Sequence, residues 1–580
     1  MKYINILSTL AVLAASVKAE SFLSNAKRAE IFKLTDNAVP TMDFTLPEDE
    51  YALLKKSINE SMMADGYDNP WTDFSTKNAT MVFTLNGEKQ KFKKVNFSLG
   101  GMSSHYYPKA AYNIKIRGKD ELYGRKNFRI RSDIRDPTVM RSKLFCDITN
   151  RLNLVNSISA NYVKMTINGE DLGFNVLLDS LKKSTVEIEY NDVESTHLIQ
   201  CKKNGAQLTY DTIDFCSNEN EDNPDMTEFG ELLKSLDTAK SIKDIEDIFD
   251  VENFYKYIIL EWLTASWDHL TLYGHNFNVY KIPNGKWVFS LYDFDTTFAG
   301  ELDLGLWGRI PVPLDGTNPD TWSKVLFKDW ISEDQHILQV FNKDEKRFLK
   351  NLQEVLDNAF NPEFLFKRID EIKDFIRPYV KEDRTPDENG VLPGRINTAS
   401  LFYDFNYDQW EGSTEFKTIQ THFFVWEGFS YPLKKWVLDK YAFVCKNYDV
   451  DCSVGKKYLE DYEFKTYADS YETTFVVIPD TANTTTTTVE GEVNATTSVP
   501  VSSIEQSTTV VPATTVVPTT TVAPTTTVKP VETIKITTTK AKTTKVVSTK
   551  NVKTTKKAKK TVVKTVVVKK VITKTVKKAN

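Results

Sequence analysis

Four oxygen-bearing side chains that could do chemistry lie close together in the sequence: Asp268, Asn276, Asp293 and Asp295. Carboxylate and amide oxygens are the ligands that Mg²⁺ prefers, with water and phosphate completing its shell. Phosphoryl transfer requires metal ions that neutralise the phosphates, a carboxylate that accepts the hydroxyl proton, and a nearby cation. The order Asp, Asn and then a strand ending in Asp-Phe-Asp parallels the order of these parts in kinases. The pattern therefore predicts a metal-dependent phosphotransfer site.

A β-hairpin must position these side chains. The strand-like runs Phe277–Ile282 and Lys286–Tyr292 flank a Pro-Asn-Gly turn. A hairpin places the residue that enters its first strand beside the residue that leaves its second, so we expect Asn276 about 5 Å from Asp293 between Cα atoms. Asp268 follows the end of an apolar helix. Taken alone, an Asp-x-Asp after a strand is also typical of a solvated turn, and Asn276 could simply cap the hairpin.

The same residues carry a resemblance to a known family. The segments between Gly101 and Phe298 resemble the CotH kinase-like family, which comprises secreted or spore-coat proteins related to bacterial spore coat protein H. The matching segments follow one another in the family's order: Gly101–Ser104, Lys109–Ile116, Asp136–Leu144, Asn168–Phe174, Asp268, His275–Tyr280, Gly285–Trp287 and Tyr292–Phe298.

The resemblance implies an atypical protein kinase that binds ATP and Mg²⁺ (or Mn²⁺ or Ca²⁺) and phosphorylates Ser or Thr of secreted or surface proteins. Carried over by position, Asp268 is the catalytic base, and Asn276, Asp293 and Asp295 hold the metal. The nucleotide-site candidates are Lys115, Ser103, Ser104 and Arg141. An exposed strand lysine would explain Lys115 equally well, and a solvated helix face is the default interpretation of Arg141.

The sequence also departs from the family pattern. Asn113 replaces a lysine, Asp179 replaces a glutamate, and Lys182 replaces an acidic residue. These changes weaken the expected Lys–acid ion pair of the nucleotide site, so a non-catalytic surface or adhesion protein on the same fold is an alternative. A carbohydrate-active enzyme using the pair Asp293 and Asp295 is less favoured, because no aromatic sugar subsite is indicated around them.

The body of the chain predicts an α+β, two-lobed, atypical protein-kinase-like fold, with a β-rich lobe over residues 20–200 and a helix-rich lobe over 201–478. Alternating runs predict strands over Met81–Leu85, Lys91–Leu99, Tyr112–Arg117, Asn127–Arg131 and Tyr162–Ile167, with turns at Asn86-Gly87 and Asn168-Gly169. Helical spacing predicts helices beginning at Asp136, over Met226–Leu236, Ile242–Phe249 and Val251–Ser266, within 340–375, and over Tyr431–Lys446.

Residues 1–19 are typical of a signal peptide, so we expect a secreted or cell-surface protein with no membrane span. Secretion permits disulfides. Among the five cysteines we expect the pairs Cys201–Cys216 and Cys445–Cys452, with Cys146 buried in a helix, and the spacing excludes a zinc cluster. Glycosylation sequons occur at Asn59, Asn78, Asn96, Asn483 and Asn494.

The net charge of −5 averages an acidic body and a basic tail. Residues 1–480 hold 57 basic and 75 acidic residues, whereas 481–580 hold 17 Lys, 4 Glu, 31 Thr and no aromatic residue. This composition predicts a disordered, O-glycosylated tail over 479–580. Its lysines could instead bind anionic wall polymers, or its Thr-Lys repeats could be phosphorylated by the acidic body. Nucleic acid is not an expected partner, and we expect a monomer.

Overall fold

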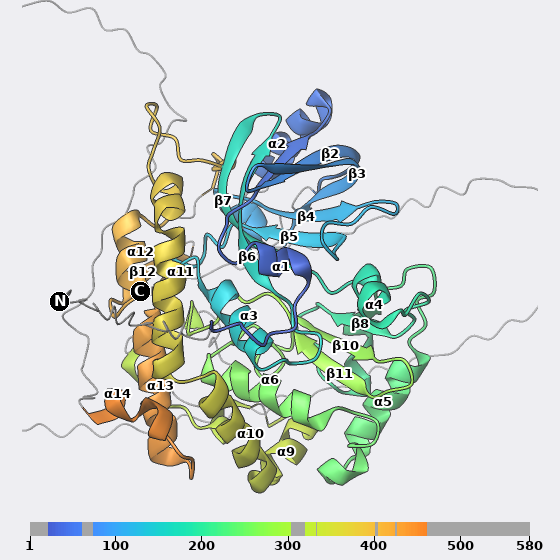
Figure 1. The fold of residues 1–580 in the computed structure, drawn as a ribbon. Helices are drawn as coiled ribbons and strands as arrows, with labels where there is room; N and C mark the ends of the chain where they lie inside the picture. Colours follow the sequence, from blue (N-terminus) through green and yellow to red (C-terminus); the bar gives the residue numbers. More distant parts are fainter. Residues whose placement is uncertain are drawn as a thin grey trace, which may run out of the picture. The chain divides into compact units, whose positions relative to one another are not determined.

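The computed structural model describes residues 21–60, 73–101, 103–302, 319–331, 333–400, 404–423 and 426–460 (Figure 1). All of them fall within one compact unit, residues 1–485. The predicted signal peptide, the tail over 479–580 and the sequons at Asn483 and Asn494 lie outside the described residues.

Seven strands close into a barrel, in the order β1-β2-β3-β4-β5-β7-β6. Only the β1–β6 pair is parallel; the other neighbours are antiparallel. The predicted Asn-Gly turns join β2 to β3 and β6 to β7, with positive φ at all four turn residues, as tight hairpins require. The strands are β1 Thr41–Thr45, β2 Ser75–Leu85, β3 Glu88–Gly100, β4 Ala111–Ile116, β5 Asn127–Arg131, β6 Ala160–Ile167 and β7 Glu170–Asp179.

Alternation along each strand separates the barrel interior from its surface. On β4, Tyr112, Ile114 and Ile116 are buried, whereas Asn113 and Lys115 are exposed. The inward residues form one hydrophobic core, which the helices α1 Glu30–Leu34 and α2 Glu48–Glu60 help to cover. Because side chains fill the interior, the barrel is a packed support and its outer surface must carry the chemistry.

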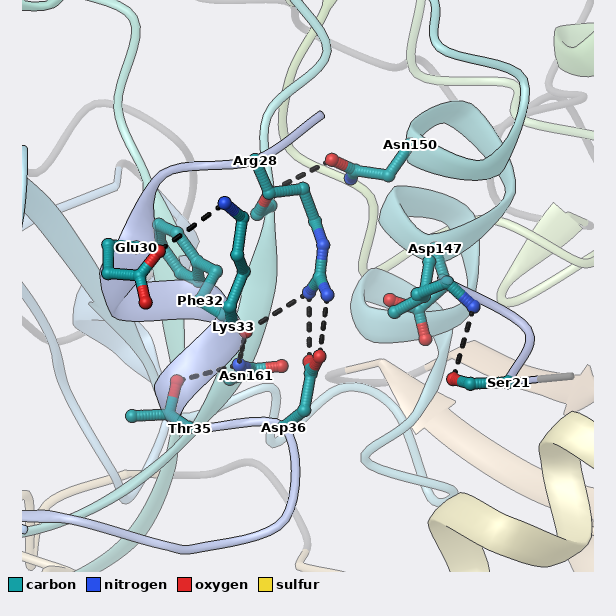
Figure 2. Close-up of polar contacts among 12 residues, drawn as sticks. Ser21, Arg28, Glu30, Phe32, Lys33, Thr35, Asp36, Asp147, Asn150 and Asn161 are labelled. Atoms are coloured by element: carbon teal, nitrogen blue, oxygen red, sulfur yellow. Dashed lines mark hydrogen bonds and ion pairs between the residues drawn. The ribbon is translucent and has the colours of Figure 1, made fainter. Parts of the chain in front are cut away.

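The segment that precedes the barrel is held against α3 (Arg141–Arg151) and β6 (Figure 2). Arg28 pairs with Asp36, and its Nη1 also donates to the carbonyl of Phe32 at 3.1 Å. Asn161 Nδ2 donates to the same carbonyl at 2.8 Å and to Thr35 Oγ1 at 2.7 Å. The chain is therefore fixed in place well before the first strand.

A second sheet, in the order β11-β10-β8-β9, lies below the barrel in the view of Figure 1 and carries the predicted hairpin. Its strands are β8 Leu198–Cys201, β9 Cys216–Asn218, β10 Phe277–Lys281 and β11 Trp287–Leu291. Helix α6 Val251–Leu263 packs on β11 of this sheet. The other helices that follow the barrel strands in the described body are α4 Lys183–Tyr190, α5 Thr227–Thr238, α8 Phe327–Trp330, α9 His336–Lys343, α10 Glu345–Asn358, α11 Pro362–Asp383, α12 Tyr407–Ser413, α13 Leu433–Asn447 and α14 Lys456–Glu460. A third sheet is the hairpin of β12 Ile419–Phe423 and β13 Trp426–Ser430.

The described body has two hydrophobic cores, one inside the barrel and a larger one around the second sheet, α3 and the helices. Strands β6 and β7 contribute to both, because Val163 and Leu177 face the barrel interior while Tyr162 and Phe174 face the larger core. The α+β class predicted from sequence is confirmed. No helix among the described residues is long and apolar enough to cross a membrane.

Two predicted helices begin or end elsewhere. The helix predicted to begin at Asp136 begins at Arg141, because Val139 adopts a φ of +55° that interrupts it. The Asp136 carboxylate still accepts from the backbone amides of Met140 and Arg141, each at 2.9 Å, so it caps the helix from farther upstream than expected. The helix predicted over Ile242–Phe249 is only a short 3₁₀ turn, Ile242–Asp244.

The two expected disulfides are present. Cys201–Cys216 joins the facing residues of β8 and β9, and Cys445–Cys452 closes the end of α13. Cys146 is buried within α3 and unpaired.

The three sequons in the described body lie in different environments. Asn78 is exposed on β2, and Asn96 is half-buried on β3. Asn59 donates to the carbonyl of Ile396 and accepts from Thr398, so its side chain joins two distant parts of the fold.

Candidate active site

The structure places Asp268 and Asn276 in contact at one end of the hairpin. Asn276 Nδ2 donates to Asp268 Oδ2 and to the Asp268 carbonyl, each at 3.1 Å. Tyr292 N donates to the carbonyl of Asn276 at 3.1 Å, so the strand pairing continues to the residue before Asp293. The observed register pairs Asn276 with Tyr292, one residue short of the pairing with Asp293 predicted from sequence. The hairpin nevertheless brings Asp268, Asn276 and the start of the Asp-Phe-Asp segment together.

A second side chain holds Asp268 from the other side. His275 Nδ1 lies 3.2 Å from Asp268 Oδ1, and His275 Nε2 lies 2.6 Å from the carbonyl of Lys202, just after β8. Burial lowers the pKa of His275, but the hydrogen bond and charge of Asp268 outweigh it and raise the pKa. The raised pKa favours the protonated ring, which donates at both nitrogens. His275 therefore joins the Asp268 carboxylate to the backbone just after β8.

The Asp-Phe-Asp segment is fixed by its central ring. Phe294 stacks on Phe145 of α3 at 4.1 Å between centroids and on His269 at 5.4 Å. Asp293 adopts a φ of +72°, a left-handed conformation that is uncommon outside Gly, although Asn and Asp adopt it more often than other residues. Packing of the ring thus holds the two carboxylates in place despite an unfavourable backbone at Asp293.

A cation that sequence reasoning missed faces this segment from the barrel. Arg131, the last residue of β5, forms an ion pair with Asp293. Burial alone would raise the pKa of Asp293, but the guanidinium groups of Arg131 and Arg129 lower it. Arg129 also lies over the Tyr292 ring, 4.8 Å from its centroid. The alternation in Asn127–Arg131 predicts that both arginines lie on one face of the strand. The sequence does not indicate which residues that face contacts.

Gly101, the first residue of the Gly-Met-Ser-Ser segment, packs directly on Arg131. Gly101 has a φ of +71°, and a Cβ atom there would lie 2.5 Å from Ser104 Oγ and 2.6 Å from Arg131 Nη1. Ser104 Oγ donates to the carbonyl of Gly100 at 2.6 Å, and the side chain of Ser103 lies outside the described residues. Glycine therefore lets the backbone at residue 101 approach the guanidinium of Arg131 closely.

Next to this segment lies a small pocket lined by Ser104, Arg131, Asp133, Arg135 and Asp295. Burial, and then the charge of Asp293, raises the pKa of Asp295 to about 6. Burial, and then the charge of Asp295, raises the pKa of Asp133 to about 8. The pocket therefore holds two carboxyl groups whose charged forms are disfavoured, because its arginines do not fully balance them.

The side chains of this site can supply some of the ligands that a divalent cation needs, and water and phosphate would supply the others. Among the described residues, no three His, Cys, Asp or Glu side chains are close enough to bind a metal ion on their own. Both carboxylate oxygens of Asp133 are buried without a partner in hydrogen-bonding geometry. Mg²⁺ usually takes one or two carboxylates and completes its shell with water and phosphate. The donor set fits such an ion.

The remaining nucleotide-site candidates, Lys115 and Arg141, lie in different environments. Lys115 is exposed on the outer face of β4, and the structure does not test its proposed role. Arg141 is fully buried: it pairs with Asp136 and also donates to backbone carbonyls of Thr297 and Tyr431. These contacts account for Arg141 as a residue that holds the fold, and its nucleotide role stays a prediction.

Two of the three departures from the family pattern, Asp179 and Lys182, form ion pairs. Asp179 accepts from Arg125 Nε at 2.8 Å and 2.9 Å, and Lys182 pairs with Glu219 at 2.6 Å. A different buried lysine, Lys109, pairs with Asp383 at 2.8 Å, and burial lowers its pKa to about 8.

The fold is a closed barrel whose Arg131 pairs with Asp293 at the end of the hairpin. The chain belongs to the CotH family: the family described as CotH kinase protein matches residues 97–418, more than half of its length.

Three relatives come from Rhizopus delemar. Invasin CotH2 is 26% identical over 412 residues, covering 67% of this chain and 64% of the relative. Invasin CotH3 is 25% identical over 422 residues, covering 68% and 65%. Invasin CotH7 is 28% identical over 188 residues, covering 30% and 31%. The chain thus matches slightly less than two thirds of the length of the first two relatives.

Proposed function

We propose that this protein is a secreted, two-lobed atypical kinase that transfers the γ-phosphate of ATP to Ser or Thr of secreted or surface proteins. The barrel would be the lobe that covers the nucleotide, and the hairpin sheet with its helices the lobe that holds the acceptor. The observation that carries the proposal is the Asp268–Asn276 contact beside Asp293, with Arg131 opposite.

Each side chain has a role that its contacts support. Asp268, oriented by His275 and Asn276, accepts the hydroxyl proton of the acceptor. Asn276 uses its amide nitrogen for Asp268, which leaves its oxygen for a cation. Asp293 and Asp295 would complete the protein's ligands, and the bound cation would neutralise phosphate charge.

The barrel supplies the positive side of the site. Arg131 lies between Asp293 and Gly101, so its remaining donors can bind the transferred phosphoryl group. We therefore prefer Arg131 to Lys115 as the phosphate-binding cation, because Lys115 is exposed on the surface of β4.

The test is phosphate transfer from labelled ATP to a Ser/Thr peptide library with Mg²⁺ or Mn²⁺. Wild type should label peptides, and Asp268→Asn should reduce the rate about 100-fold or more while leaving ATP binding intact. Asp247→Asn, at an exposed carboxylate outside the site, is the matched control and should act like wild type. Wild-type protein that binds ATP with metal yet labels no substrate would contradict the kinase proposal.

A non-catalytic surface protein is the second candidate. The names of the relatives, which are called invasins, favour it. The residue at position 182 also favours it, because the family has an acidic residue there and this chain has Lys182, which pairs with Glu219. Such a protein would use the barrel and hairpin only as a scaffold. Metal-dependent release of phosphate from ATP, abolished by Asp268→Asn, would exclude it.

A further inference from the structure

The charges around the pocket beside Gly101 do not cancel. Arg131 pairs with Asp293, and Arg135 pairs with Glu301. After these pairs are formed, Asp133 and Asp295 are left, and neither makes an ion pair within 4.0 Å in the described part of the chain. Two carboxylates that share a pocket without cations of their own repel each other, so they disfavour the folded state.

Asp133 is the less balanced of the two. Its side chain comes from the segment after β5, with a φ of +42°, and the residue is only 3% exposed. Neither oxygen has a partner in hydrogen-bonding geometry, although the Ser142 hydroxyl is near enough to favour the charged form. A buried carboxylate with so little compensation is rare in native proteins and requires an explanation.

We infer that Asp133 and Asp295 together bind a divalent cation, so that the barrel contributes a metal ligand across the pocket from the hairpin. The inference rests on the proposed function, because phosphate oxygens and water would complete the shell. It adds a ligand that the sequence pattern did not indicate. It also gives the barrel and the hairpin a common partner, since one ligand comes from each.

The experiment is a titration with Mn²⁺, alone and with a non-hydrolysable ATP analogue, followed by the loss of the free aquo-ion signal in electron paramagnetic resonance. Wild type should bind Mn²⁺ in at least one of these conditions. Asp133→Asn and Asp295→Asn should each weaken Mn²⁺ binding about tenfold or more. Loss of a residue that hydrogen-bonds to a metal ligand already reduces metal affinity by about this factor, and loss of the ligand itself should reduce it at least as much. Asp120→Asn, at an exposed carboxylate on the same barrel, should bind like wild type.

Thermal unfolding in EDTA separates a metal ligand from a structural residue. Removing an uncompensated charge should raise the Tm of Asp133→Asn or leave it unchanged, and addition of Mn²⁺ should then stabilise the variant less than wild type. Asp133→Ser is a second variant that also removes the charge. A lower Tm in EDTA with unchanged Mn²⁺ affinity would overturn the inference.

The result also separates this inference from the proposed function. Wild-type protein that binds Mn²⁺ through Asp133 but transfers no phosphate would support the cation site and contradict the kinase. Phosphate transfer by the wild type, together with unchanged Mn²⁺ affinity in Asp133→Asn, would support the kinase and contradict the cation site at Asp133.

Discussion

Arg131 lies at the point where barrel and hairpin meet, and its charge balances a carboxylate that the fold has largely removed from water. The exposed fractions of the Arg131 and Asp293 side chains are 11% and 20%. Removing one partner of such a pair leaves the other charge poorly solvated, which costs more than the pair itself contributes.

We therefore expect Arg131→Gln to lower the free energy of unfolding by about 2–3 kcal/mol, less than for a fully buried pair because both side chains retain some solvent. The double variant Arg131→Gln/Asp293→Asn should recover part of that loss. Urea unfolding in EDTA measures both values. Arg129→Gln, which removes a cation from the Tyr292 ring but no ion pair, should cost about 1 kcal/mol or less. Additive effects of the Arg131 and Asp293 changes would show that the pair is not coupled.

Glu261 is a second buried carboxylate that positions the site from behind. Its Oε2 accepts from Thr271 N at 2.8 Å and from Thr271 Oγ1 at 2.6 Å, which fixes the loop that carries Asp268. Burial raises its pKa to about 8 from an ordinary value of 4.5. The folded state therefore binds more protons than the unfolded state between these two values, so the free energy of unfolding falls as pH rises through that window.

We expect Glu261→Gln to remove this dependence. The difference in free energy of unfolding between Glu261→Gln and wild type should therefore shift in favour of the variant by several kcal/mol from pH 5 to pH 8. Urea unfolding at the two pH values measures the change, with the exposed Glu187→Gln as control. An equal difference between wild type and Glu261→Gln at both pH values would show that Glu261 does not titrate in this range.

At the scale of elements, the strand pair β8–β9 supports the site through its backbone. The carbonyl of Cys201 accepts from the Tyr292 hydroxyl at 3.3 Å, and the carbonyl of Lys202 faces His275 at 2.6 Å. The Cys201–Cys216 disulfide holds this strand end against β9. The position of the proposed base thus depends on a covalent link outside the site.

Replacing Cys201 and Cys216 by Ser should lower the free energy of unfolding by about 3 kcal/mol, as expected for a loop of this length, and should also reduce phosphate transfer. Replacing Cys445 and Cys452 is the matched control, because their bridge lies at the end of α13 and spans 7 residues instead of 15. It should affect stability alone. Unfolding curves and initial rates distinguish the pairs, and equal losses of activity would contradict the supporting role of β8.

The elements also show why the sequence revealed part of the site and not the rest. The hairpin and the Asn-Gly turns depend on neighbours in the chain, so local pattern was sufficient to predict them, although the hairpin register differs from the prediction by one residue. Arg131 and Asp293 are 162 residues apart, and Arg135 and Glu301 are 166 apart. Their contact depends on how the barrel packs on the second sheet, which no local pattern specifies. The early break at Val139 was likewise invisible, because a β-branched residue rarely adopts positive φ.

At the scale of the whole molecule, an acidic body is joined to a Thr- and Lys-rich tail of opposite charge. If the Thr-Lys repeats are acceptors, labelled ATP should label residues 479–580 of the full chain, and the label should fall as salt screens the attraction. Peptide mapping by mass spectrometry locates the label, and Asp268→Asn is the control that should leave it absent. A tail that stays unlabelled while another substrate is phosphorylated would favour the glycosylated stalk.

Closure of the barrel sets the smallest piece of this chain that can fold. The family match begins at residue 97, within β3, whereas β1 and β2 lie before it. A fragment cut at that boundary would lose β1, β2 and most of β3, so the remnant of β3 and the strand β6 would become open edges. Unpaired edges of hydrophobic sheets are sites of intermolecular pairing. The segment shared with the family is therefore not an autonomous folding unit, and the family's sequence boundary cuts through a structure that must be kept whole.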